Sequence, residues 1–457
     1  MIRRFFNVHF SIAIQVIISE LLRRSSLRSF SKIGLLVSSA MLVVSSAAFG
    51  SGFGIFEQGA KATAMGGAFV ATADDPSAIF YNVAGIAQQR HLAVLAGGTV
   101  INFSNEFRGD PTDPITVGTT GEYRKHTFIP PNAYLIVPVG NNLTFGVGMF
   151  TPFGLRTNWT EPWVGRFISR DANVKVISVE PAVAWQTTDG RIAIGAGVEY
   201  RRSHVVLNRN NATFNPLTGR VIDSANAYLN SDWDTTTAWN AGVLLKPTPT
   251  WRFGLSYRSD ATIDYKGSAH FTQIPTGTPI DTLVAAGLPP DQSIATSINF
   301  PAMLAGGIAT SAFGHNWDLE ADVTHTTWSR FKSLAVTFGT STALSFDRPQ
   351  NWKDTYSYRI GANKKVNDMW DVRFGAVYDR NPQPLEGVGP LLPDADREGA
   401  SFGIGWHSGP FVVDLTEFAL HFKTRSTNGL GDLQGDHFHG TYKTNANLIS
   451  FNAGYRF

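Results

Sequence analysis

The chain has 457 residues, with 38 basic and 36 acidic side chains and a formal net charge of +2, which gives no general case for nucleic-acid binding. A mean hydropathy of −0.06 excludes a bundle of membrane helices, and the absence of cysteine excludes disulfides and cysteine metal sites. Glycine (44 residues) and aromatic side chains (12%) are frequent, whereas charged side chains (16%) are few. The length fits about two or three soluble domains or one large barrel.

Residues 1–50 are predicted to be a signal peptide with an upstream extension. Basic residues precede the apolar run 33–44, and the small residues SSAAFGS follow it. This order predicts export by a signal peptide, cleaved after Ala48 or Gly50. An earlier apolar stretch, residues 5–22, is interrupted by polar side chains, and a true membrane anchor there is the alternative.

The next segment, residues 51–89, is glycine-rich and precedes the first strand-like pattern. Within it, DDPSAIFYNVAGIA (74–87) predicts a short helix. Asp75 is expected to cap its N-terminus, with Pro76 at the first helical position and Gly85 as the C-cap.

Residues 90–457 show a period-two alternation that predicts strands. One face is apolar, and the other is polar or carries very small side chains. The clearest examples are RIAIGAGVEYR (191–201), WRFGLSYR (251–258), WDLEADV (317–323) and WDVRFGAVYD (370–379). A soluble sandwich would also alternate, so the strands alone do not decide the class.

Two further features favour a membrane barrel over a sandwich. Trp251, Trp317 and Trp370 each open a strand directly after a tight turn, as an interfacial aromatic girdle requires. Short turns alternate with long polar connections, which is the usual arrangement in outer-membrane barrels. The long connections are expected around 106–121, 151–172, 209–234, 268–293, 329–351, 381–398 and 425–442.

Counting strands between these connections predicts fourteen, an even number as such barrels require. A lumen of that width is not filled by wall side chains, so residues 51–89 are expected to plug it. The predicted fold is therefore all-β: a 14-stranded antiparallel transmembrane β-barrel, residues 90–457, with a small N-terminal hatch in the lumen. The last strand, LISFNAGYRF, ends on an aromatic residue and resembles the signal read by the outer-membrane barrel assembly machinery.

Several stretches resemble the FadL/TodX family of outer-membrane transporters for long-chain fatty acids and aromatic hydrocarbons. The resemblance covers nearly all of residues 52–457, and its motifs occur in the family's order. They are GFGIFEQGAKATAMGGAFVATADDPSAIFYNVAGIA, TPFGLRTNWTEPWVGRF, WNAGVLLKPTPTWRFGLSYRSDATIDYKGSAHF, ADVTHTTWSRF, NWKDTYSYRIGANKKVNDMWDVRFGAVYDRNPQP and LLPDADREGASFGIGW.

This resemblance implies passive uptake of hydrophobic compounds through the bacterial outer membrane, with long-chain fatty acids favoured. Outer loops would capture the substrate, an interior site would bind it, and a gap in the wall would release it sideways into membrane lipid. Neutral aromatic hydrocarbons are the alternative substrates. We expect a monomer that needs no cofactor, binds no nucleic acid and is not an enzyme. An outer-membrane lipid hydrolase is a less favoured alternative, because no marked Ser–His pair supports it.

The family motif also assigns positions to the hatch and to the exit. Asn82, Val83 and Ala84 stand where the family has Asn-Pro-Ala, so the fixed φ of proline is lost here. Pro152 and Gly154 close the third strand, and the resemblance makes this the kinked strand that opens the wall. An ordinary helix cap and an ordinary strand end are the alternative interpretations.

The resemblance places the substrate carboxylate on two basic residues, Arg209 and Arg348. An arginine fork suits a carboxylate, although pairing with neighbouring acids is nearly as good an explanation. Phe53, near the start of the hatch, is expected to touch a bound acyl chain. Loop side chains expected to be exposed and to capture substrate are Phe153, Leu155, Trp159 and Trp163. The alternative is that these loops pack on one another and cap the barrel.

The remaining motif is DHFHG, with His437 and His439. Two histidines without a third ligand are weak evidence for a metal site, and loop exposure is the better interpretation. The sequence contains no P-loop, G-x-S-x-G or zinc-protease motif.

Overall fold

The computed structural model describes residues 52–457 except 125, 217 and 315. The predicted signal peptide, residues 1–50, lies outside the described residues. In the described part of the chain, no helix has the length and apolar character needed to cross a membrane.

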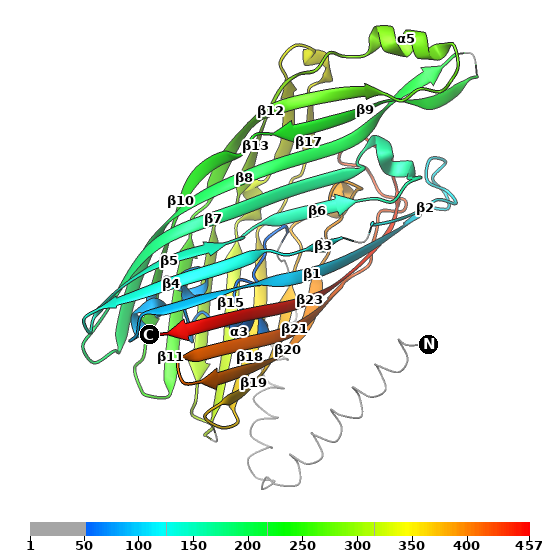
Figure 1. Ribbon diagram of the computed structural model, residues 1–457. Coiled ribbons are helices and arrows are strands. Elements are labelled where there is room, and N and C mark those ends of the chain that lie inside the picture. The colour runs from blue at the N-terminus through cyan, green and yellow to red at the C-terminus, as the bar shows by residue number, and fades with distance from the viewer. Residues whose placement is uncertain (1–51, 125, 217, 315) are drawn as a thin grey trace. The chain divides into compact units, whose positions relative to one another are not determined.

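Fourteen antiparallel strands in the described residues form a closed barrel, as predicted (Figure 1). The last strand pairs with the first along its whole length, from Ala93–Arg456 to Gly109–Gly440. The wall strands are β1 (Ala93–Gly109), β4 (Pro131–Val139), β5 (Leu143–Phe150), β7 (Asp171–Gln186), β8 (Ile192–Asn215), β10 (Asp234–Leu245), β11 (Trp251–Arg258), β14 (Met303–Thr310), β15 (Trp317–Thr326), β18 (Thr355–Lys365), β19 (Trp370–Asp379), β20 (Arg397–Ser408), β21 (Phe411–Phe422) and β23 (Gly440–Arg456).

The predicted alternation places apolar side chains outward and polar ones inward. On β8, Ile194 and Val198 are 49% and 58% exposed, whereas Glu199 and Arg201 are fully buried towards the lumen. The predicted tryptophans are the first residues of β11, β15 and β19. A wall of this kind meets hydrocarbon on one side and a polar interior on the other, which explains the period of two.

Several connections predicted as long loops are instead β-structure. Residues 209–234 form a hairpin in which β8 continues into the connection and pairs with β9 (Arg220–Ser231). This sheet is extended by β12 (Ala261–Gln273), β13 (Gln292–Phe300), β16 (Ser333–Phe338) and β17 (Phe346–Pro349). These additional strands project past the rest of the barrel and carry helix α5 (Ile280–Gly287; Figure 1). One face of these strands is buried and apolar, with Leu229, Phe271 and Phe338 in one cluster. The polar residues and the prolines and glycines between the strands concealed this alternation, because they are also typical of loops.

The other strand segments continue the wall strands beyond breaks. They are β2 (Thr120–Glu122), β3 (Thr127–Phe128), β6 (Gly154–Asn158), β9 (Arg220–Ser231), β12 (Ala261–Gln273), β13 (Gln292–Phe300), β16 (Ser333–Phe338), β17 (Phe346–Pro349) and β22 (Arg425–Ser426). The helices are α3 (Ala60–Ala64), α4 (Ala78–Tyr81), η1 (Val83–Gln88), η2 (Val164–Phe167), α5 (Ile280–Gly287), η3 (Trp328–Arg330), η4 (Thr342–Leu344) and η5 (Leu385–Gly387).

Residues 52–89, the hatch segment, pack against the inner faces of wall strands. Glycines of the wall make room for this close approach. A Cβ atom at Gly242, Gly254 or Gly375 would come within 2.1 Å of the Asn82 side chain, the Val70 carbonyl oxygen or the Gly66 amide, respectively. These glycines belong to β10, β11 and β19, so the hatch segment contacts distant parts of the wall at once.

The helix predicted in 74–87 is shorter than expected and is divided in two. α4 begins only at Ala78, because the Asp75 carboxylate accepts hydrogen bonds from the backbone and hydroxyl of Ser77 and shapes a turn instead of a helix cap. Gly85 lies inside η1 and is not a C-cap. Its lack of a side chain is required there, since a Cβ would come within 2.2 Å of the Ala73 carbonyl oxygen.

Candidate substrate-binding site

The third wall strand is interrupted at residues 151–153, here called the kink segment. β5 ends at Phe150 and β6 begins at Gly154, and both pair with β7. Pro152 has no N–H to donate to a sheet, so a regular ladder cannot run through this point.

The backbone of the kink segment pairs instead with residues 52–58, here called the arm. The Ile55 amide donates to the Pro152 carbonyl at 2.9 Å, and the Gly154 amide donates to the Phe53 carbonyl at 3.0 Å. These bonds flank an antiparallel bridge between Gly54 and Phe153. The start of the hatch segment and the break in the wall are therefore held together directly.

The wall is weakly paired beside the kink. β3 pairs with β1, and β6 pairs with β7. In the described residues, pairing between these two edges is limited to the Tyr123–Trp159 bridge and its adjacent backbone bonds. A sheet with so few cross-strand bonds leaves a gap that side chains line.

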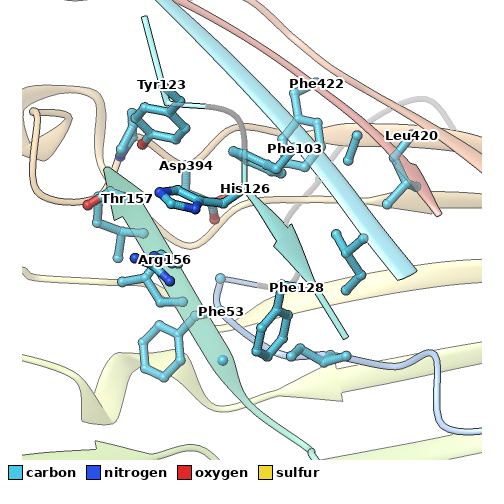
Figure 2. A pocket seen from close by; sticks show the side chains of 18 of the residues that line it. Phe53, Phe103, Tyr123, His126, Phe128, Arg156, Thr157, Asp394, Leu420 and Phe422 are labelled. Atoms are coloured by element: carbon cyan, nitrogen blue, oxygen red, sulfur yellow. The ribbon is translucent and has the colours of Figure 1, made fainter. Parts of the chain in front are cut away.

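A cavity of about 160 Å³, the side pocket, lies at this gap (Figure 2). A cavity of about 150 Å³ is large enough for benzene, so the side pocket holds a group of roughly that size. Its lining is amphipathic: in Figure 2, Tyr123, His126, Arg156, Thr157 and Asp394 gather on one side, while Phe103, Leu420 and Phe422 lie on the other and Phe53 and Phe128 lie below.

The polar end of the side pocket is anchored to the arm. Arg397 donates to the Gly52 carbonyl at 2.7 Å, lies 3.4 Å from an oxygen of Asp394, and stacks over the ring of Phe422. Asp394 is only 5% exposed, and burial raises its pKa to about 6, although Arg397 opposes this shift. A carboxyl group in this state can change protonation near neutral pH.

Phe53 lies inside an aromatic cluster. Five rings have centroids 4.7 to 6.1 Å from its own: Phe153, Phe300, Trp328, Phe331 and Trp352. Arg201, fully buried, stacks on two of these rings. Phe53 is thus surrounded by apolar side chains, the kind of environment that its predicted contact with an acyl chain requires.

Arg209 and Arg348, predicted from the sequence to act together, line one small pocket. The cavity measures about 20 Å³, little more than one water, and Leu334, Phe346 and Leu391 complete its walls. Arg348 makes a bidentate ion pair with Asp436, one bond measuring 3.2 Å. Arg209 stacks at 5.0 Å over Phe346. Pairing with a neighbouring acid, the alternative given from the sequence, therefore explains Arg348 but not Arg209.

The prediction of exposed capture side chains is wrong for three of the four residues. Phe153, Trp159 and Trp163 are at most 2% exposed. The two indoles stack at 4.0 Å, and both donate to backbone carbonyls. Tertiary packing of one loop on another buries them, which is the alternative left open above. Leu155 is partly exposed and lines the side pocket.

The predicted hatch motif ties the hatch segment to the wall. The Asn82 amide group donates to the Val70 carbonyl at 2.8 Å and to the Val243 carbonyl of β10 at 3.1 Å. Its oxygen accepts from the Ala84 amide, which caps η1. Val83 follows at the first position of η1 and is buried.

Sequence reasoning missed the residues that make the polar end of the side pocket. Asp394 and Arg397 were noted only within the stretch LLPDADREGA, and His126 was not singled out. Nothing in the spacing predicts that His126 meets the other two, because it precedes them by more than 260 positions in the chain. Among the residues that the structure describes, His437 and His439 belong to no group of three or more side chains suited to a metal ion.

A closed antiparallel barrel with an apolar exterior and a polar interior defines the class of outer-membrane β-barrels. The particular family is shown by comparison: the chain belongs to the outer membrane protein transport proteins (OMPP1/FadL/TodX), whose family model matches residues 41–457. The resemblance stated from the sequence and the outer-membrane location are thereby confirmed.

Individual relatives are distant but cover most of the chain. A long-chain fatty acid transport protein of Salmonella typhi is 24% identical over 389 residues, covering 80% of this chain and 86% of the relative. A crystal structure of a Pseudomonas aeruginosa FadL homologue matches with a TM-score of 0.78 and 22% identity, covering 89% and 100% of the two chains. The P. putida toluene transporter TodX matches with a TM-score of 0.69 and 15% identity, covering 90% and 99%.

Proposed function

We propose that this protein takes up hydrophobic compounds passively across the outer membrane, with long-chain fatty acids as its main substrates. The observation that carries the proposal is the side pocket, an amphipathic cavity at a weakly paired gap in the wall. An apolar molecule gains free energy by leaving water for such a lining. A lateral exit at this gap would deliver it to membrane lipid without a passage through a watery pore.

The route would run from the outer loops through the aromatic cluster to the side pocket. Phe53 fills the cluster, and its neighbours in the arm pair with the kink segment. A ligand that displaced Phe53 would therefore also disturb the pairing at Pro152 and Gly154. This coupling supports the interior site and the lateral gate as two parts of one path, with residues 52–89 acting as the hatch.

Arg209 favours an acid as the substrate. In the described residues its guanidinium has no ion pair and no hydrogen-bond acceptor, and it lies over an aromatic ring in a mainly apolar pocket. An unpaired guanidinium in such a place suits a carboxylate. The name of the Salmonella typhi relative agrees with this choice. Uptake of neutral aromatic hydrocarbons by the same route is the second candidate, favoured by the aromatic cluster and by the fold shared with TodX.

The test compares palmitate and toluene uptake in cells whose only transporter of this type is this protein. Arg209→Met should lower palmitate uptake about tenfold, because a hydrogen bond to a charged group contributes about 1.5–3 kcal/mol, and should leave toluene uptake unchanged. Arg202→Met is the matched control, since Arg202 is exposed on the opposite face of the same strand. Equal palmitate uptake in the Arg209 variant would refute the carboxylate role, and failure of the wild type to take up either compound would refute the function.

A further inference from the structure

Four polar atoms of the residues that line the side pocket have no hydrogen-bond partner. Within the described residues they are Asp394 Oδ2, Asn158 Oδ1, His126 Nε2 and Arg397 Nε, and each atom is buried. An unsatisfied buried polar group costs about 1–3 kcal/mol. Four such atoms among the residues that line one cavity favour a polar group as its occupant.

These atoms come from three separate segments of the chain. His126 lies between β2 and β3, Asn158 ends β6, Asp394 precedes β20, and Arg397 begins it. The other oxygen of Asp394 is already used by Arg397, and Arg397 in turn holds the arm through the Gly52 carbonyl. Asp394 and Arg397 are thus fixed in place by contacts made elsewhere, as in a preorganised binding site.

The chemistry of these atoms restricts the group that would satisfy them. Asp394 Oδ2, when ionised, and Asn158 Oδ1 only accept hydrogen bonds, so the ligand must donate one. Arg397 Nε only donates, so the ligand must also accept one. A hydrocarbon does neither, and an ester or an ionised carboxylate only accepts. A hydroxyl group or an undissociated carboxylic acid does both.

The opposite end of the side pocket is lined by hydrocarbon. Ile101, Phe103, Phe128, Leu420 and Leu448 line it. A cavity of about 160 Å³ has room for a head group and a few carbons, so a longer chain must extend out of it. The gap between β3 and β6 provides that direction, towards the lipid-facing side of the wall.

We propose that the side pocket is a subsite for the head group of an amphiphile that both donates and accepts hydrogen bonds, either an undissociated carboxylic acid or an alcohol. This inference rests on the proposed uptake of hydrophobic compounds. It assigns the two pockets to different forms of the head group. The small pocket lined by Arg209 and Arg348 would take the ionised carboxylate, and the side pocket would take the neutral head group beside Asp394. A neutral head is the form that enters a bilayer at low cost, which suits a site next to a lateral exit.

The experiment measures binding of four probes to the purified full-length protein: palmitic acid, 1-hexadecanol, methyl palmitate and hexadecane. Asp394→Leu and Asn158→Leu should each weaken hexadecanol and palmitic acid binding about tenfold, since each removes an acceptor that contributes about 1.4 kcal/mol. Methyl palmitate and hexadecane should bind as they do to the wild type. Asp396→Asn is the matched control, because Asp396 is in the same segment but does not line the pocket.

A second measurement locates the head group. Palmitic acid with a photoreactive diazirine next to the carboxyl group should label residues near 126, 158 and 394, and a diazirine at the chain end should not. Labelling by the head probe only around Arg209 and Arg348 would overturn the proposal, as would equal losses for all four probes in both leucine variants. If the wild type binds none of the probes, the proposed function fails as well; if it binds all four and the variants change nothing, only the subsite fails.

Discussion

The body of the hatch segment, residues 60–89, and its arm, residues 52–58, are held in different ways. Four successive amides of the body donate to two buried carboxylates of β15: Phe69 and Val70 to Asp322, and Ala71 and Thr72 to Glu320, over 2.6 to 3.0 Å. The wall adds further hydrogen bonds to the body: Arg258 to the Phe80 carbonyl, Arg359 to the Gly66 carbonyl and Ser401 to the Ala64 carbonyl.

The arm is held mainly by neutral hydrogen bonds, such as those between the Gln58 side chain and the Thr151 backbone, and by the aromatic packing of Phe53. Its pairing partner is the kink segment, itself the least regular part of the wall, and the one charged side chain that holds its start is Arg397 in the described residues. Dispersion contacts tolerate displacement by another apolar group, whereas buried charge-assisted bonds do not. From this difference we predict that the body stays in place while a ligand displaces Phe53 and the start of the arm.

The strongest test of this comparison locks the arm. Gly54 and Phe153 form a non-hydrogen-bonded antiparallel pair, the kind of pair whose side chains come closest, and the chain has no cysteine of its own. Gly54→Cys combined with Phe153→Cys should therefore form a disulfide. Uptake of palmitate should fall to the level of cells without the protein. The same variant under reducing conditions is the control, and equal uptake in both states would show that the arm need not move.

A second test loosens the body. Asp322→Ala leaves the Phe69 and Val70 amides without their acceptor, which should destabilise the seated hatch by about 2–4 kcal/mol. The barrel should remain folded, because β1 and β23 close it independently. We expect increased single-channel conductance and faster amide hydrogen exchange in residues 66–73. Asp264→Ala, at an exposed position on β12, should change neither. Unchanged exchange in the Asp322 variant would contradict the anchoring role.

The smallest effect is expected for Val83→Pro. Val83 is the first residue of η1, where proline is well tolerated, and Asn82 before it is already extended, with φ of −157° and ψ of 103°. The substitution should leave stability unchanged or raise it by up to about 1 kcal/mol. Ala84→Pro is the contrasting variant, because it removes the amide that donates to Asn82. A higher conductance in the Val83 variant than in the wild type would show that the hatch motif has been misinterpreted.

The barrel was predictable because its signal is local and repeated. Alternation on β8, tryptophans at the starts of β11, β15 and β19, and short turns between strands all depend on near neighbours in the chain. The strands that extend the sheet beyond the wall (β9, β12, β13, β16 and β17) were predicted less well. The sequence predicts a loop at residues 209–234 because polar residues and the turn residues NPLTG stand out there, whereas the buried, alternating Ala225, Ala227 and Leu229 give only a weak apolar periodicity.

The candidate site was predictable only where a motif marked it. The family resemblance predicts Phe53, Pro152, Gly154, Arg209 and Arg348 as site residues, and the structure adds which of them meet. It pairs the arm with the kink and places both arginines in one pocket. The burial of Trp159 and Trp163 could not be predicted, because whether a loop side chain faces water depends on the loops that fold over it.

The sequence by itself therefore determined the class of protein, the number of wall strands and the family. These follow from a period of two, turn residues and motifs, all of which are read along the chain. Only the tertiary structure decided how the interior is organised. The carboxylates of β15 meet the hatch amides some 250 positions away, and His126, Asn158, Asp394 and Arg397 meet at one cavity. Closing a sheet into a barrel brings residues together by the register and curvature of the whole wall, which no local pattern encodes.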